Sequence, residues 1–124
     1  MKLKDCEILL TEPRGFCAGV ERAIGIVNRA VELFDGKIYV KHEVVHNKNV
    51  IEELTKKGVM FIESLDEVPN KSILIYSAHG VSKKVTNIAK KKDLKIFDAT
   101  CPLVTKVHLQ IHKSVSYTHL RAHE

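Results

Sequence analysis

Two cysteines occupy matching positions in the sequence, each between a short apolar run and the start of a helical pattern. Cys17 lies in PRGFCAGV (13–20), and Cys101 lies in FDATCPLV (97–104). A helix N-terminus favours the thiolate form of cysteine, which is the form that binds soft metals and iron–sulfur clusters. We therefore predict that the two thiols share one site. For either cysteine taken alone, the alternative of a small buried apolar side chain remains open.

Two histidines precede helical patterns in the same way. His46 lies in HEVVHN (42–47), and His79 lies in SAHGVS (77–82). Imidazoles and free backbone N–H groups at a helix N-terminus bind phosphate oxygens, so both histidines are candidates for an anion site. A solvated loop histidine or a local helix cap is the alternative for each. We expect His42 to be structural, because it points the opposite way along the 41–44 run. For His108, on the last helix, a surface position and a site position both remain open.

Short apolar runs alternate with helical patterns along the chain. We expect strands at 7–10, 38–40, 59–62, 73–76 and 95–97, and helices that begin near Ala18, Asn47 or Asn49, Ser82 and Pro102. This alternation predicts an α/β fold with a mostly parallel sheet and helices on both faces. The segments that follow the strands carry Cys17, His46, His79 and Cys101. Because ligands bind beyond the carboxyl ends of parallel strands, we expect these four residues to share one rim.

Composition narrows the class of protein. The 124 residues suffice for one domain with a core, and the excess of 20 Lys and Arg over 15 Asp and Glu fits an anionic ligand, an acidic protein or nucleic acid. The absence of Trp and of a GxxxxGK[ST] phosphate loop argues against a nucleic-acid stacking platform and a nucleotide-binding loop. No apolar run could span a bilayer, and the charged N-terminus is unlike a signal peptide. Three widely spaced cysteines then predict a cytoplasmic protein with free thiols or metal ligands.

The last ten residues differ from the rest. VSYTHLRAHE (115–124) departs from the helical pattern that begins at Leu103 and resembles the translation of a sequencing adapter. We therefore expect residues 1–101 to form an N-terminal α/β domain, 102–114 to begin the next domain with its first helix, and 115–124 to be a non-native tail. A genuine helix end is the alternative for the tail. Cys6, which precedes the first strand, is expected to have a packing role.

Together, the four segments around Cys17, His46, His79 and Cys101 resemble the N-terminal third of the 4-hydroxy-3-methylbut-2-enyl diphosphate reductase family, from about Glu7 to about Lys113. The resemblance implies that this is the first of three similar α/β domains around one [4Fe–4S] cluster. Cys17 and Cys101 match two of its three cysteine ligands, and His46 and His79 match two of the histidines that bind the substrate diphosphate or its surroundings. The family reduces an allylic diphosphate to isopentenyl and dimethylallyl diphosphate, with electrons from a ferredoxin- or flavodoxin-type donor.

The family's third cysteine and catalytic Glu have no counterpart in these 124 residues. The resemblance therefore implies an inactive fragment that carries no catalytic residue of its own, with no nucleic-acid or membrane partner. Two other classes remain open. One is a structural zinc module that uses Cys17, His46, His79 and Cys101, and the other is a non-catalytic protein that binds RNA or phosphorylated ligands through its basic surface.

Overall fold

The computed structural model describes residues 7–122, with side chains described as far as Ser116. Its centre is a four-stranded parallel sheet with the order β2-β1-β3-β4. The strands are β1 (Ile38–Lys41), β2 (Val59–Ile62), β3 (Ile73–Tyr76) and β4 (Lys95–Asp98). The predicted α/β class and parallel sheet are therefore confirmed.

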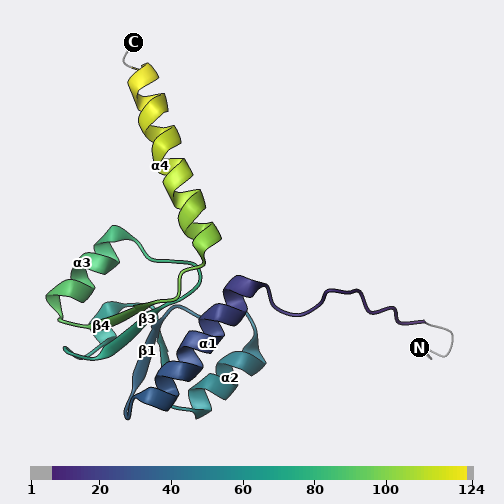
Figure 1. The fold of residues 1–124 in the computed structure, drawn as a ribbon. Helices are drawn as coiled ribbons and strands as arrows, with labels where there is room; N and C mark the ends of the chain where they lie inside the picture. Colours follow the sequence, from purple (N-terminus) through teal and green to yellow (C-terminus); the bar gives the residue numbers. More distant parts are fainter. Residues whose placement is uncertain (1–6, 123–124) are drawn as a thin grey trace, which may run out of the picture.

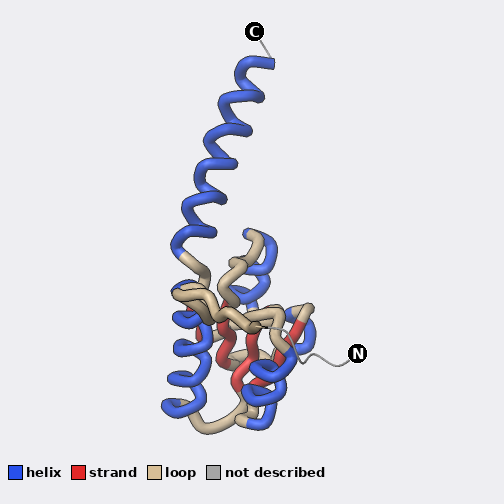
Figure 2. The backbone as a smooth tube through the Cα atoms, turned by 90° about the vertical axis from the view of Figure 1, so that its right-hand side faces the viewer, coloured by secondary structure: helices blue, strands red, loops and turns tan. Residues whose placement is uncertain are grey.

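Helices cover both faces of the sheet. They are α1 (Ala18–Leu33), α2 (Lys48–Lys56), α3 (Lys83–Lys91) and α4 (Pro102–Ala122), with a 3₁₀ turn η1 (Leu65–Glu67). In Figure 1, α1 and α2 lie together on one side of the strands and α3 lies on the other. Helix α4 extends away from this body, as the turned view in Figure 2 also shows.

Alternation along the strands supplies two apolar clusters, one on each face. Val40 and Ile75 are fully buried on the face that α1 and α2 cover, where Val27 of α1 packs against them. Tyr39 and Leu74, one position away, are buried on the opposite face beneath α3 and η1. Burial of a side chain of this size stabilises the fold by roughly 1.5–3 kcal/mol. Two apolar faces in consecutive positions explain why the strands read as continuous apolar runs.

Side-chain caps fix the starts of two helices at the residues that the sequence indicates. Asn47 Oδ1 accepts a hydrogen bond of 3.2 Å from the backbone N–H of Val50 at the start of α2. Ser82 Oγ accepts one of 3.4 Å from the N–H of Val85 at the start of α3. Each bond satisfies an N–H group that has no partner within its own helix. Since Asn47 follows His46 directly, the cap also fixes the end of the loop that carries His46.

The strand expected at 7–10 is not formed. Ile8, Leu9 and Leu10 are 83%, 80% and 69% exposed, and their segment runs out from the body (Figure 1). The positions on either side of β1 are occupied by β2 and β3, and residues 7–10 pair with neither edge strand. The prediction of a strand at 7–10 was therefore wrong. An apolar run favours burial, but it does not specify which strand it pairs with.

Helix α4 begins at Pro102, as expected, and its backbone remains helical to Ala122 through the segment where the sequence pattern changes. The division at residues 101 and 114, and the non-native origin of 115–124, remain predictions. The packing role expected of Cys6 lies outside the described residues. Among residues 7–122, no helix is both long and apolar enough to cross a membrane.

Candidate anion and thiol site

The order of the strands creates one crevice at the carboxyl ends of β1 and β3. From β1 the chain moves outward to β2 on one side, and from β3 it moves outward to β4 on the other. Loops that leave the two central strands therefore diverge, and the space between them is the usual ligand position of an open parallel sheet. The loop after β1 is residues 42–47, and the loop after β3 is residues 77–82.

These two loops bring three imidazoles together. The ring centroids of His46 and His79, both predicted from the sequence, lie 5.5 Å apart. The ring of His42 lies 6.0 Å from that of His46 and 5.5 Å from that of His79, edge-on to each. The described chain thus carries a cluster of three histidines at the crevice.

The structural role expected of His42 does not account for its position. Its φ of +65° is left-handed, which interrupts the alternation of side chains along β1 and turns the ring toward the other two histidines. Its backbone N–H donates a 2.8 Å bond to the carbonyl of Ile62, so the residue stays attached to the end of β2. The alternation rule fails at a left-handed residue. The signal that could have identified His42 is its H-x-x-x-H spacing with His46.

A carboxylate supports His42. The Nδ1 atom of His42 lies 2.8 Å from Oε1 of Glu63, which directly follows β2, and Lys41 Nζ lies 3.7 Å from the other oxygen. The hydrogen bond from His42 is the main reason that the pKa of Glu63 lies below its usual value, with further contributions from the charges of His42 and Lys41. Glu63 therefore stays ionised at neutral pH.

The other two histidines have local polar partners. His46 Nδ1 lies 3.5 Å from Oε2 of Glu43, and His79 Nδ1 lies 3.4 Å from Oγ of Ser77. Burial lowers the pKa of His79, and the nearby His42 and His46 lower it further. His79 is consequently neutral near pH 7 and gains affinity for a proton when an anion binds beside it.

Cys101 links the two sides of the site. Its backbone N–H donates a 3.0 Å bond to the carbonyl of Ala78, in the loop that carries His79. Its side chain lies against Gly19 in the first turn of α1: a Cβ atom on Gly19 would lie 2.6 Å from Cys101 Sγ. Arg22 Nη1 adds a 3.2 Å bond from α1 to the carbonyl of Thr100. The start of α1 and the loop after β4 are therefore in direct contact.

Cys17 is the residue immediately before α1, two positions from Gly19. Both Cys17 and Cys101 are free thiols; Cys17 is exposed and Cys101 is half-buried. The structure thus brings the two predicted cysteines to neighbouring segments, at the sheet end that also carries His79. The first turn of α1 positions Cys17 there, and the strand expected before it at residues 7–10 is not formed.

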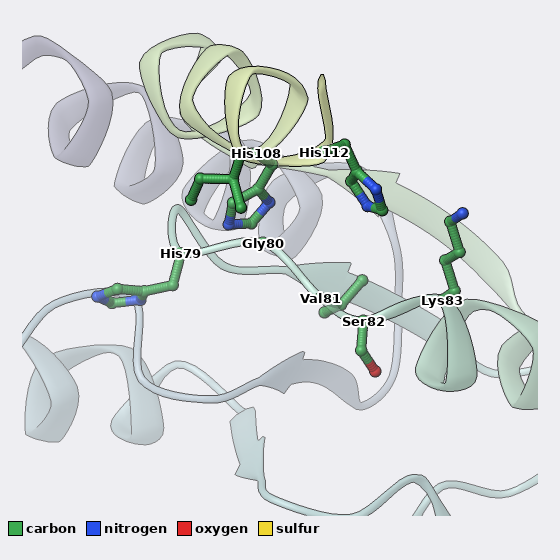
Figure 3. Close-up of a pocket in the computed structure, with 8 residues that line it drawn as sticks. His79, Gly80, Val81, Ser82, Lys83, His108 and His112 are labelled. Carbon is green, nitrogen blue, oxygen red and sulfur yellow. The ribbon is translucent and has the colours of Figure 1, made fainter. Parts of the chain in front are cut away.

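A pocket of about 610 Å³ opens beside His79, between the loop after β3 and α4 (Figure 3). It is lined by His79, Gly80, Val81, Ser82, Lys83, His108, Ile111 and His112. His108 and His112 extend from α4 toward the loop, and none of the described residues that line the pocket is a carboxylate. His108, for which the sequence left a surface position and a site position open, is exposed and also contributes to this pocket. The pocket favours an anionic or neutral polar occupant over a cation.

Among the side chains that the structure describes, residues 7–116, no group of three or more His, Cys, Asp or Glu is arranged to hold a metal ion. The basic surface considered for RNA is also partly committed to the fold. Lys92 Nζ donates bonds of 2.6 and 2.9 Å to the carbonyls of Leu65 and Val68. These contacts connect α3 to η1, which gives that lysine a structural role.

A model of the LytB protein family matches residues 8–120. Among curated proteins, the chain is similar to a 4-hydroxy-3-methylbut-2-enyl diphosphate reductase from Acinetobacter baumannii, with 62% identity over 107 residues. A reductase of the same name from Shewanella halifaxensis is 63% identical over 107 residues. Each match covers 86% of this chain, but only 34% and 35% of the respective relative. The chain therefore spans about a third of the length of the curated relatives that it matches.

The chain is also similar to about a third of the length of solved reductase structures. The chain superimposes on the E-1-hydroxy-2-methyl-but-2-enyl-4-diphosphate reductase from Plasmodium falciparum with a TM-score of 0.81 and 53% identity, covering 86% of this chain and 33% of that one. It also matches an (E)-4-hydroxy-3-methyl-but-2-enyl diphosphate reductase, described as the terminal enzyme of the non-mevalonate pathway. There the TM-score is 0.71 and the identity 32%, over 86% of this chain and 39% of that one.

Proposed function

This chain belongs to the LytB protein family, and from that membership we propose that it supplies the first α/β domain of an iron–sulfur reductase acting on 4-hydroxy-3-methylbut-2-enyl diphosphate. The reductases that it resembles carry this name and are about three times as long as the matched part. The activity, substrate and partners of such a whole protein are accordingly proposed for this chain.

The observation that carries the proposal is the proximity of His46 and His79, whose rings lie 5.5 Å apart on loops from two strands. Imidazoles at a strand crevice can donate hydrogen bonds to phosphate oxygens, and the capped start of α2 directly beyond His46 offers backbone N–H groups nearby. A diphosphate is the group on the proposed substrate that fits such a site. His46 and His79 are the substrate-binding residues that we propose.

Two features support Cys17 and Cys101 as ligands of a [4Fe–4S] cluster. Both are free thiols beside the N-termini of helices, and the contact with Gly19 brings Cys101 against the first turn of α1. They would supply two of the cluster's thiolate ligands, and the third would come from outside these residues. When bound, the cluster supplies the electrons for reduction, which a ferredoxin- or flavodoxin-type protein delivers.

In the proposed reaction, the allylic C–O bond breaks, the allyl group gains two electrons and one proton, and the hydroxyl group leaves as water with a second proton. The products are isopentenyl and dimethylallyl diphosphate. This chain's part is to bind and orient the diphosphate. A neutral His79 has a ring N–H that can donate to a phosphate oxygen, and it can take up a proton as negative charge arrives. We propose that the catalytic proton donor lies outside residues 1–124. We also propose that the protein is cytoplasmic.

A chimera tests the proposal. Residues 8–113 of this chain would replace the matching segment of the Acinetobacter baumannii reductase, which is 62% identical over the aligned region. The purified, anaerobically reconstituted chimera would be assayed for consumption of the allylic diphosphate with a chemical reductant. We expect turnover within about tenfold of the parent enzyme, since a tenfold change in rate corresponds to only about 1.4 kcal/mol.

Variants of the chimera separate the two parts of the site. Cys17→Ser and Cys101→Ser should remove the cluster's visible absorption, whereas His46→Asn and His79→Asn should keep it and raise KM. A chimera that holds a full cluster but does not turn over would contradict the proposed function. The same assay on the chain alone tests the expectation that the chain is inactive by itself. If the reconstituted protein contained zinc in place of iron and acid-labile sulfide, the zinc module would be favoured instead.

A further inference from the structure

We propose that His42, held by Glu63, is a third imidazole of this anion site and contacts a bound diphosphate together with His46 and His79. The inference deepens the proposed function and depends on it for the identity of the anion. It assigns a ligand-contacting role to a residue that the sequence pattern indicates is structural, and a supporting role to the carboxylate after β2.

The backbone of His42 is held in a conformation that few side chains adopt. Its φ is +65°, and a left-handed residue other than glycine persists only where its surroundings enforce it. Here the enforcing contact is the 2.8 Å bond from its N–H to the carbonyl of Ile62, one residue beyond the β1–β2 pairing. Such residues concentrate at functional sites, and the ring of this one lies within 6.0 Å of the rings of His46 and His79.

Glu63 fixes the orientation of the ring. Because its Oε1 lies 2.8 Å from Nδ1 of His42, the proton on Nδ1 is held by the carboxylate and Nε2 is the nitrogen left for another partner. A carboxylate that directs one ring nitrogen while the other serves a ligand is a common arrangement for working histidines. Lys41, 3.7 Å from the second carboxylate oxygen, holds Glu63 from the other side.

The position of the ring completes the argument. His42 is edge-on to His46 at 6.0 Å and to His79 at 5.5 Å, so an anion bound among the three rings can contact all of them. Within the described residues, the ion pairs at the cluster join His42 and Lys41 to Glu63, and His46 to Glu43, so each of the two carboxylates faces a histidine. Three imidazoles offer a multiply charged anion more hydrogen-bond donors than two do.

The test uses the chain itself with inorganic diphosphate as the probe. Imidazole ¹⁵N and ¹³C signals of the labelled protein would be followed by NMR during a diphosphate titration near neutral pH. We expect saturable shifts at His42, His46 and His79 together, and the ¹⁵N shifts of His42 should report a proton on Nδ1. The wild-type titration decides the question even if a variant does not fold.

The variants isolate His42 and its support. His42→Asn should weaken diphosphate binding by about tenfold, the loss typical of one hydrogen bond to a charged group. Asn is chosen because it tolerates a left-handed backbone. Glu63→Gln should remove the preference of His42 for a proton on Nδ1 and keep the fold. Glu32→Gln is the matched control: Glu32 is similarly exposed and paired with Arg29 in the last turn of α1, and its loss should change neither measurement.

Two results would overturn the inference. The first is a His42→Asn variant that binds diphosphate with the same affinity as wild type, while His46→Asn or His79→Asn binds it more weakly. The proposed anion site would then remain, but without His42. The other is a wild-type titration with no saturable shift at His42. Neither result bears on turnover by the chimera, so the proposed function stands or fails separately.

Discussion

The sulfur of Cys101 lies where a side chain on Gly19 would have to be. A Cβ atom on Gly19 would be 2.6 Å from Sγ and 3.1 Å from Cβ of Cys101, and real Cβ atoms essentially never approach another atom as closely as the first of these distances. Gly19 is in the first turn of α1, and Cys101 directly precedes α4. Glycine is therefore required at position 19 because there is no room for a larger side chain. This close contact links the positions of the two segments that carry the cysteines.

Replacement of Gly19 by Ala should destabilise the protein by about 1–3 kcal/mol, because overpacking forces the Cys101 segment to move. The free energy of unfolding in urea measures this loss. Gly25→Ala is the matched control in the same helix, because a Cβ there would have no atom within 4 Å. That substitution should stabilise the helix by about 0.5–1 kcal/mol. Equal effects at the two glycines would contradict the packing argument.

Asn47→Ala should cost roughly 1 kcal/mol of stability, because it removes the side chain that caps α2. Asn47→Asp should retain the cap, since a carboxylate oxygen can accept the same bond from Val50. Urea denaturation followed by circular dichroism would compare the three proteins. An Ala variant as stable as the Asp variant would show that the hydrogen bond contributes little.

Acidification should weaken the fold in part through His79. Burial and two neighbouring histidines lower its folded-state pKa from the ordinary value of 6.5, so below about pH 6.5 the unfolded chain binds a proton that the folded chain resists. The contribution of His79 to the free energy of unfolding therefore falls as the pH drops from 6.5 toward the folded-state pKa, and this contribution is constant well above 6.5.

The test of this linkage compares wild type with His79→Gln at about pH 7.5 and about pH 5.5. Wild type should lose more stability between the two values than the variant does. Glu63 stays ionised over this range because its pKa lies below 4.5, so it does not confuse the comparison. Identical losses in the two proteins would mean that His79 titrates in the folded state as it does in the unfolded chain.

The two free thiols should differ in accessibility. Cys17 is exposed before α1, whereas Cys101 is half-buried against Gly19. In a Cys6→Ser background, a thiol reagent should label Cys17 several times faster than Cys101, as followed by mass spectrometry of peptides. The Gly19→Ala variant should speed the labelling of Cys101 by displacing it, and unchanged labelling would argue against the contact.

Much of the fold follows from the order of apolar runs. Strands β1 to β4 and all four helices occupy the segments where periodicity indicates them, and the Asn47 and Ser82 caps are readable from residue type. The gathering of His46 and His79 also follows, because parallel strands direct their following loops to one end of the sheet. These features depend on local patterns and on one topological rule.

Two features could not be read in this way. The orientation of His42 depends on a left-handed backbone angle, which no periodicity encodes for a residue other than glycine. The exposure of residues 7–10 depends on which strands are neighbours in the sheet, and an apolar run does not specify its neighbouring strand. In both cases the missing information is a contact between segments far apart in the sequence.

Helix α4 has a physical consequence of its own. After its first turns meet the loop that carries Gly80, it extends from the body, with Ile111 and Val115 54% and 60% exposed (Figures 1 and 2). Helices without tertiary packing are marginal in water. Amide protons in the outer half of α4 should then exchange with deuterated solvent on the timescale of a free peptide. Those of α1, which covers the sheet through Ala23 and Val27, should persist until the whole domain opens.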